Sequence, residues 1–160
     1  MSDFSHAWVL SRKRFVDEIA DLNAEQLNWR IYPGALTIGE MALHVAGVEL
    51  SFGSQLLGTQ LEGFAQKVAK AATQGVVNKE PFPFDKAEIT PELVSDALKL
   101  GSESVQPLID AAEPAMRQKE LKSALGPMIT GEGAFARFGF HPGYHQGQAY
   151  LIKNSPGFPR

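Results

Sequence analysis

Three of the four histidines in this chain have the spacing and surroundings of metal ligands. His141 and His145 are four residues apart, which on a helix puts both side chains on one face with Cβ atoms roughly 5–6 Å apart. Two imidazoles at this spacing can bind one ion, although such a pair can equally be solvated or locally hydrogen-bonded. A third ligand must come from elsewhere, and His44 is the candidate because it lies in an apolar stretch. Taken alone, His44 could also be a core histidine satisfied by a hydrogen bond.

An apolar wall around an imidazole keeps it neutral, so that its lone pair is free for a metal. Helical bundles bring ligands from facing helices together in their cores. The three histidines therefore predict one divalent ion per chain, zinc or nickel first and iron or manganese as further options. The chain has no cysteine, which excludes thiolate ligands and a cysteine nucleophile. Three protein ligands would leave a position for water or substrate; the alternative is a metal-free protein with three structural histidines.

The elements that must position these residues are helices. Apolar residues recur at three- and four-residue steps, and no convincing alternating strand is present, so the predicted class is all-α, a four-helix bundle. Thr37 and Glu40 have the spacing of a capping box. Pro142 interrupts the last pattern, which predicts either a kink beside His141 or a helix that begins there. The predicted helices cover residues 3–22, 37–57, 60–73 and 91–112, and a last one, with Tyr144 buried, follows a connection at 126–133 and ends near 153.

Length and composition limit the classes of protein. A chain of 160 residues that is 44% hydrophobic can bury the core of one globular domain, so we expect a single domain over residues 1–160. The net charge of −3, with scattered Lys and Arg, argues against nucleic-acid binding. The chain has no run of about 18 apolar residues, so we expect no membrane-spanning helix. The N-terminus also lacks the pattern of a signal peptide. We therefore predict a cytoplasmic protein with neither a membrane nor a nucleic acid as partner.

Two segments, WRIYPGALTIGEMALHVAGVE and HPGYHQGQAYLIK, resemble the DinB-like (YfiT-like) family, and the resemblance covers nearly the whole chain. It implies an up-down-down-up four-helix bundle, often a homodimer, whose metal is held by one histidine on the second helix and two on the fourth. By motif, these ligands are His44, His141 and His145. The chain departs from the family pattern at Gln146, where many members have arginine, and at Pro142 inside the H-x-x-x-H unit. These departures imply an altered contact near the site and a possible shift of His141.

Three further residues are candidates for supporting the metal or binding a substrate. Glu40 lies one turn before the first histidine and could orient its imidazole, or could serve only in the capping box. Gln148 follows the last histidine by three residues and could hydrogen-bond a bound water or substrate, or lie on the helix surface. Arg30 lies in an aromatic turn and could receive a carboxylate-bearing substrate, or lie at the surface. Glu49 is expected to pair with a basic residue.

No catalytic residue can be assigned from these patterns, and three functions stay open. The resemblance implies S-transferases that use low-molecular-weight thiols of the bacillithiol or mycothiol type; binding to the metal would lower the pKa of the thiol and make it a nucleophile towards a small-molecule substrate. A metal-dependent hydrolase is the first alternative. A non-catalytic, dimeric stress protein that binds a metal or small ligand is the second. A protease of the HEXXH type is unexpected, because Pro142 stands where that motif has its glutamate.

Overall fold

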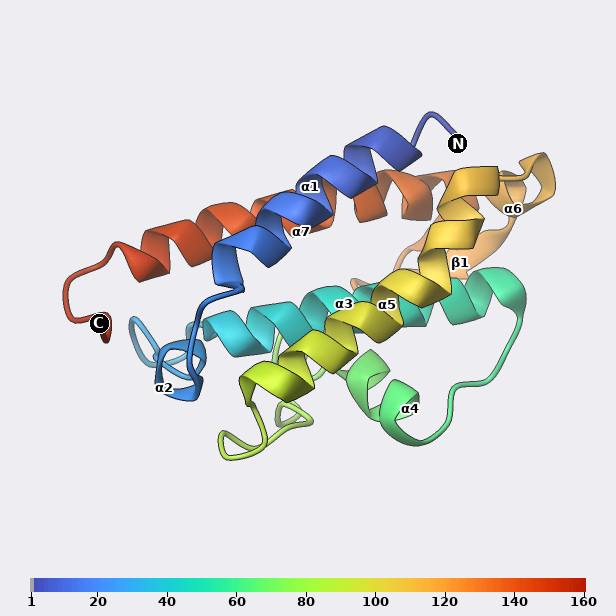
Figure 1. Ribbon diagram of the computed structural model, residues 1–160. Coiled ribbons are helices and arrows are strands. Elements are labelled where there is room, and N and C mark those ends of the chain that lie inside the picture. The colour runs from blue at the N-terminus through green and yellow to red at the C-terminus, as the bar shows by residue number, and fades with distance from the viewer. Residues whose placement is uncertain (1) are drawn as a thin grey trace.

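The computed structural model describes residues 2–160, and within that range the chain forms seven helices and one two-stranded antiparallel sheet (Figure 1). The predicted all-α class is confirmed, apart from a sheet of two three-residue strands. None of the helices in residues 2–160 is both long and apolar enough to span a bilayer. The elements in chain order are α1 (Ser5–Ile19), α2 (Ala24–Leu27), α3 (Ile38–Leu57), α4 (Gly63–Lys70), α5 (Pro91–Ala111), α6 (Pro114–Gln118), β1 (Glu120–Lys122), β2 (Met128–Thr130) and α7 (Gly131–Lys153).

Helix α3 is buried on nearly all sides. It begins after Thr37, whose hydroxyl accepts a hydrogen bond from the N–H of Glu40 (3.1 Å), while the Glu40 carboxylate accepts one from the N–H of Thr37 (2.7 Å). This reciprocal pair confirms the predicted capping box. The helix ends at Gly58, whose φ of 69° suits a residue without Cβ. Every residue from Ile38 to Leu50 is buried, because α4, α5 and α7 all pack against this helix.

The longest helices pack in two pairs, α1 with α7 and α3 with α5, and α7 also packs against α3. In Figure 1, α1 and α7 run from right to left, whereas α3 and α5 run from left to right. Helix α7 continues from Gly131 to Lys153 with Pro142 inside it. The alternative in which a helix begins beside His141 is therefore wrong, and His141 and His145 lie on consecutive turns of one helix.

Short elements account for most differences between the prediction and the structure. Helices α2 and α6 and the β1–β2 hairpin are absent from the prediction, because helices of four and five residues and strands of three residues are too short to show a periodicity. Helices α1 and α4 are shorter than predicted, and α7 begins inside the predicted connection. Tyr144, predicted to be buried, is 52% exposed because it lines a cavity and lies outside the core.

A buried ion pair ties α1 to α3. The carboxylate of Glu49, whose residue is 2% exposed, accepts hydrogen bonds from Trp8 Nε1 (3.0 Å) and Arg12 Nε (2.8 Å). Arg12 also donates to the carbonyl of Leu98 on α5. A Cβ at Gly101 of α5 would lie 2.5 Å from Glu49 Oε2, so glycine leaves room for the carboxylate. The expected basic partner of Glu49 is confirmed as Arg12, and the network joins three long helices.

We expect Arg12→Met to lower the free energy of unfolding by about 3–5 kcal/mol, because it leaves the Glu49 carboxylate buried without its cation. The matched control is Lys13→Met, which removes an exposed pair with Asp17 and should cost less than about 1 kcal/mol. Urea unfolding followed by circular dichroism measures both changes. Equal losses in the two variants would contradict the role assigned to the buried pair.

Candidate metal centre

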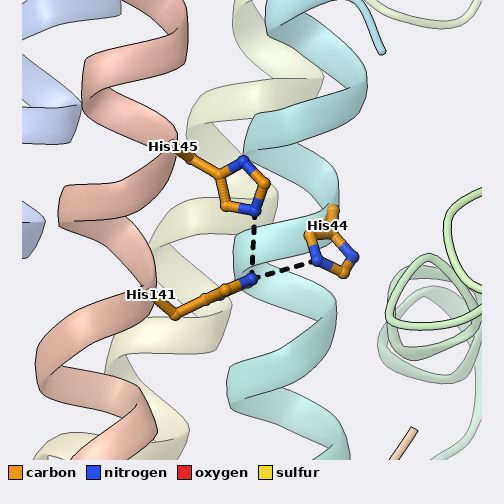
Figure 2. A group of neighbouring side chains, drawn as sticks. All are labelled: His44, His141 and His145. Carbon is orange, nitrogen blue, oxygen red and sulfur yellow. Dashed lines mark hydrogen bonds between the residues drawn. The ribbon is translucent and has the colours of Figure 1, made fainter. Parts of the chain in front are cut away.

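Three histidines from two helices converge where α3 faces α7. Figure 2 shows His44 projecting from α3 towards His141 and His145, which project from successive turns of α7. Nε2 of His141 lies 3.0 Å from Nε2 of His44 and 3.0 Å from Nε2 of His145. One ring nitrogen from each of the three residues lies within 4.8 Å of the others. The structure thus brings the three predicted ligands together, and Pro142 does not displace His141 from the cluster.

The outward-facing nitrogens of two of these rings are held by oxygen acceptors. Nδ1 of His44 lies 2.8 Å from the carbonyl oxygen of Ala71, at the end of α4. Nδ1 of His145 lies 2.7 Å from Oε1 of Gln148, which places this predicted supporting residue beside the cluster. Because these oxygens can only accept, each Nδ1 carries the proton and donates it. Nε2 of His44 and Nε2 of His145 therefore carry lone pairs, the tautomer that a metal-binding histidine needs.

Protons alone cannot satisfy the three facing nitrogens. Nε2 of His44 and Nε2 of His145 are both acceptors, and Nε2 of His141 can donate one proton to only one of them. A metal cation can accept the lone pairs of all three nitrogens at once, with the remaining proton of His141 on its Nδ1. The donor set therefore fits a divalent ion, and imidazole nitrogens suit zinc, nickel and iron.

Burial keeps these imidazoles neutral. Desolvation lowers the pKa of His141 to about 2, with electrostatic repulsion from His145 and His44 as the further causes. Desolvation also lowers the pKa of His145 to about 4, with repulsion from His44 added and the hydrogen bond to Gln148 opposing the shift. The pKa of His44 is lowered by burial against the opposing hydrogen bond to Ala71. At neutral pH, protons therefore do not compete with a metal for these nitrogens.

A glycine on α3 lets the end of α4 reach His44. A Cβ at Gly47 would lie 2.6 Å from the carbonyl oxygen of Val68 and 2.8 Å from the backbone nitrogen of Ala72. A larger residue at this position would push away the end of α4 and, with it, the carbonyl of Ala71. Sequence reasoning missed both Gly47 and Ala71. Since Ala71 contributes a backbone oxygen, which every residue type supplies, the sequence carries no signal for its role.

The other two predicted supporting residues lie at the N-terminal end of α3. Nη2 of Arg30 donates to Oε1 of Glu40 (2.7 Å), and the second carboxylate oxygen accepts from the N–H of Thr37. Glu40 is thus engaged by the cap and an ion pair, and the orienting contact to His44 comes from Ala71. Arg30 lines a separate cavity of about 540 Å³, and no histidine is among the described residues that line it.

Two cavities meet at the histidines, and His44 and His141 line both of them. The larger, of about 540 Å³, is also lined by His145 and Gln148. The smaller, of about 440 Å³, is also lined by Arg137. In the described part of the chain, no Asp or Glu lines either cavity. Both volumes are sufficient for a small molecule next to the imidazoles.

Comparison with known proteins finds a similar fold. The crystal structure of a conserved protein from Enterococcus faecalis matches this chain with a TM-score of 0.66 and 18% sequence identity, over 94% of this chain and 92% of that one. At this identity the likeness concerns the fold alone. No family model matches the sequence, and no curated protein matches it either.

The lowered histidine pKa values predict that the metal-free protein loses stability in acid. An unfolded histidine titrates near pH 6.5, whereas folded His145 titrates near pH 4, so between these values the unfolded state binds more protons. The stability that is present above pH 6.5 should therefore fall as the pH drops towards 4, by up to about 1.4 kcal/mol per pH unit for each such histidine. Urea unfolding in the presence of a chelator, at several pH values across this window, measures the slope.

His145→Gln should flatten this pH dependence, because it removes one buried imidazole. The matched control is His6→Gln, at an exposed position of α1, which should keep the wild-type slope. If His145→Gln and His6→Gln have the same slope as the wild type, the buried imidazoles are not the source of the acid sensitivity.

Proposed function

We propose that this chain binds one divalent metal ion through Nε2 of His44, His141 and His145, with zinc or nickel as the first choice and iron or manganese as the alternatives. The observation that carries the proposal is the convergence of three ring nitrogens, two from buried histidines and one from the half-buried His141, that protons cannot all satisfy. Hydrogen bonds from the outer ring nitrogens to Ala71 and Gln148 support it, because metal-binding histidines commonly have such partners.

We also infer that residues 1–160 form a single DinB-like domain, an up-down-down-up four-helix bundle. The common direction of α1 and α7, opposite to that of α3 and α5, supports this topology (Figure 1). The two sequence segments that resemble the family support it independently, and they are also the reason to expect a homodimer.

Metal content tests the proposed site. Protein purified without an affinity tag should contain about one ion per chain by elemental analysis, because three neutral imidazoles are available as ligands. His44→Ala and His145→Ala should lower the content well below this value, since each leaves only two ligands. The matched control is His6→Ala, which removes an exposed histidine and should retain the metal. Equal metal content in the wild type and the two ligand variants would refute the site.

We propose that the centre serves the transfer of a substrate group to a low-molecular-weight thiol of the bacillithiol or mycothiol type. A bound divalent ion would supply Lewis-acid chemistry that lowers the pKa of the thiol. The sulfur forms a bond to an electrophilic carbon, the leaving group departs with the electron pair of its own bond, and the thiol proton passes to solvent. Because the chain has no cysteine, the thiol is a cosubstrate. Two cavities that meet at the histidines offer space for two molecules.

The described residues of the two cavity walls offer no carboxylate as a general base, which favours thiol transfer over hydrolysis. A metal-dependent hydrolase commonly uses a carboxylate as general base beside the attacking water. Among the described residues that line the two cavities there is no Asp or Glu. Glu40, the carboxylate closest to a ligand in sequence, is engaged by Arg30 and Thr37. A thiol has less need of such a base, because its ordinary pKa of about 8.5 lies far below that of water and a bound metal ion would lower it further.

Turnover assays test the proposed reaction. Metal-loaded protein should conjugate monobromobimane or chlorodinitrobenzene with at least one thiol from a panel of biological thiols. His44→Ala should lower the rate by at least about 100-fold, because it removes a ligand, whereas His6→Ala should not. A panel of esters and amides should give no turnover.

Thiol-dependent turnover that survives the loss of His44 would overturn the metal-dependent mechanism. Hydrolysis of an ester or amide that depends on His44 would support the hydrolase instead. Metal binding without any turnover would support a non-catalytic metal-binding protein.

A further inference from the structure

Arg137 lies on the side of α7 that carries the histidines. It precedes His141 by four residues and His145 by eight, a spacing that aligns side chains along one side of a helix. Arg137 lines the cavity of about 440 Å³ that His44 and His141 also line. The guanidinium and the candidate metal centre therefore border the same space.

The guanidinium of Arg137 has no carboxylate partner within residues 2–160. Its hydrogen bond runs from Nη1 to the carbonyl of Gly133, one turn back on its own helix (3.2 Å). The ion pairs of the described chain involve other cations, and no Asp or Glu of that part lines the cavity. Since a guanidinium has five N–H donors, most of them stay available to a ligand. A half-buried, unpaired positive charge thus borders the cavity.

Most of the remaining cavity wall is apolar. Val48 and Phe52 contribute from α3 and Phe140 from α7, while Ser123 adds one hydroxyl. Apolar walls favour an apolar ligand body, and a single guanidinium matches one carboxylate through two parallel hydrogen bonds. A doubly charged phosphate would lose more hydration on entering such a cavity, so a carboxylate fits it better.

We infer that this cavity binds the electrophilic substrate as a monocarboxylate with an apolar body, its carboxylate on Arg137 and its reacting end towards His141. The inference rests on the proposed metal-dependent function, because the carboxylate bound by Arg137 is taken to be the substrate that reacts at the histidines. On one face of a helix, residues four apart have Cβ atoms roughly 5–6 Å apart. The carboxylate and the reacting atom of the substrate should therefore be separated by only a few bonds.

Isothermal titration calorimetry with phenylpropionate and its uncharged amide tests this inference on the metal-loaded, full-length protein. The wild type should bind the carboxylate more tightly than the amide. Arg137→Gln should weaken binding of the carboxylate by about tenfold or more and leave the amide unchanged, because only the carboxylate loses a charge-assisted hydrogen bond. Arg137→Lys should restore part of the loss, since it keeps the charge without the fork of donors. The matched control, Arg14→Gln, removes an exposed arginine of α1 outside this cavity and should bind like the wild type.

Three results would overturn the inference: no binding of the carboxylate by the wild type, equal carboxylate affinity in the wild type and Arg137→Gln, or equal weakening of both ligands. Metal content, measured on each variant, separates this outcome from failure of the metal site. Full metal content without an effect of Arg137→Gln refutes the anion site and leaves the metal site standing. An effect of Arg137→Gln in protein that binds no metal refutes the metal site and retains the anion site.

Discussion

The burial of α3 is the constraint on which the rest of the structure depends. Because nearly every face of this helix is covered, each polar side chain on it needs a partner inside the protein. Glu49 finds Arg12 and Trp8, which joins α1 to the core. His44 finds the carbonyl of Ala71, and its second nitrogen faces α7. One requirement, the satisfaction of buried polar groups, thus produces both the buried ion pair and the geometry of the candidate metal centre.

The orientation of the imidazoles has an electrostatic consequence. With protons on Nδ1 of His44 and His145, the Nε2 atoms of these two rings carry lone pairs, and each lies 3.0 Å from Nε2 of His141. Desolvation disfavours protonation of any of the three rings. One proton on Nε2 of His141 can satisfy only one of these two contacts, whereas a metal cation can accept the lone pairs of all three nitrogens. The outer hydrogen bonds hold the rings of His44 and His145 in place, so these two ligands are oriented for a metal cation before one binds.

The two cavities give the centre unequal surroundings. The larger is bordered by the amide of Gln148, which is engaged by His145, and the smaller by the unpaired guanidinium of Arg137. Because no carboxylate of the described residues lines either space, a bound dication would add to the charge of Arg137 without compensation from the walls. In surroundings of low dielectric constant this positive potential would extend over the cavity and would favour anionic ligands.

Interactions within one or two helical turns determined what the sequence alone could show. The cap at Thr37 predicted the start of α3, and the four-residue spacing placed His141 and His145 on one face, because capping and helical periodicity depend only on near neighbours. The group that orients the imidazole of His44, the carbonyl of Ala71, lies 27 residues away in sequence, so local patterns cannot identify it. Only the packing of α4 on α3 decided that the carbonyl of Ala71, and not Glu40, makes that contact. Packing likewise decided that α7 continues past its proline and brings its two histidines to α3.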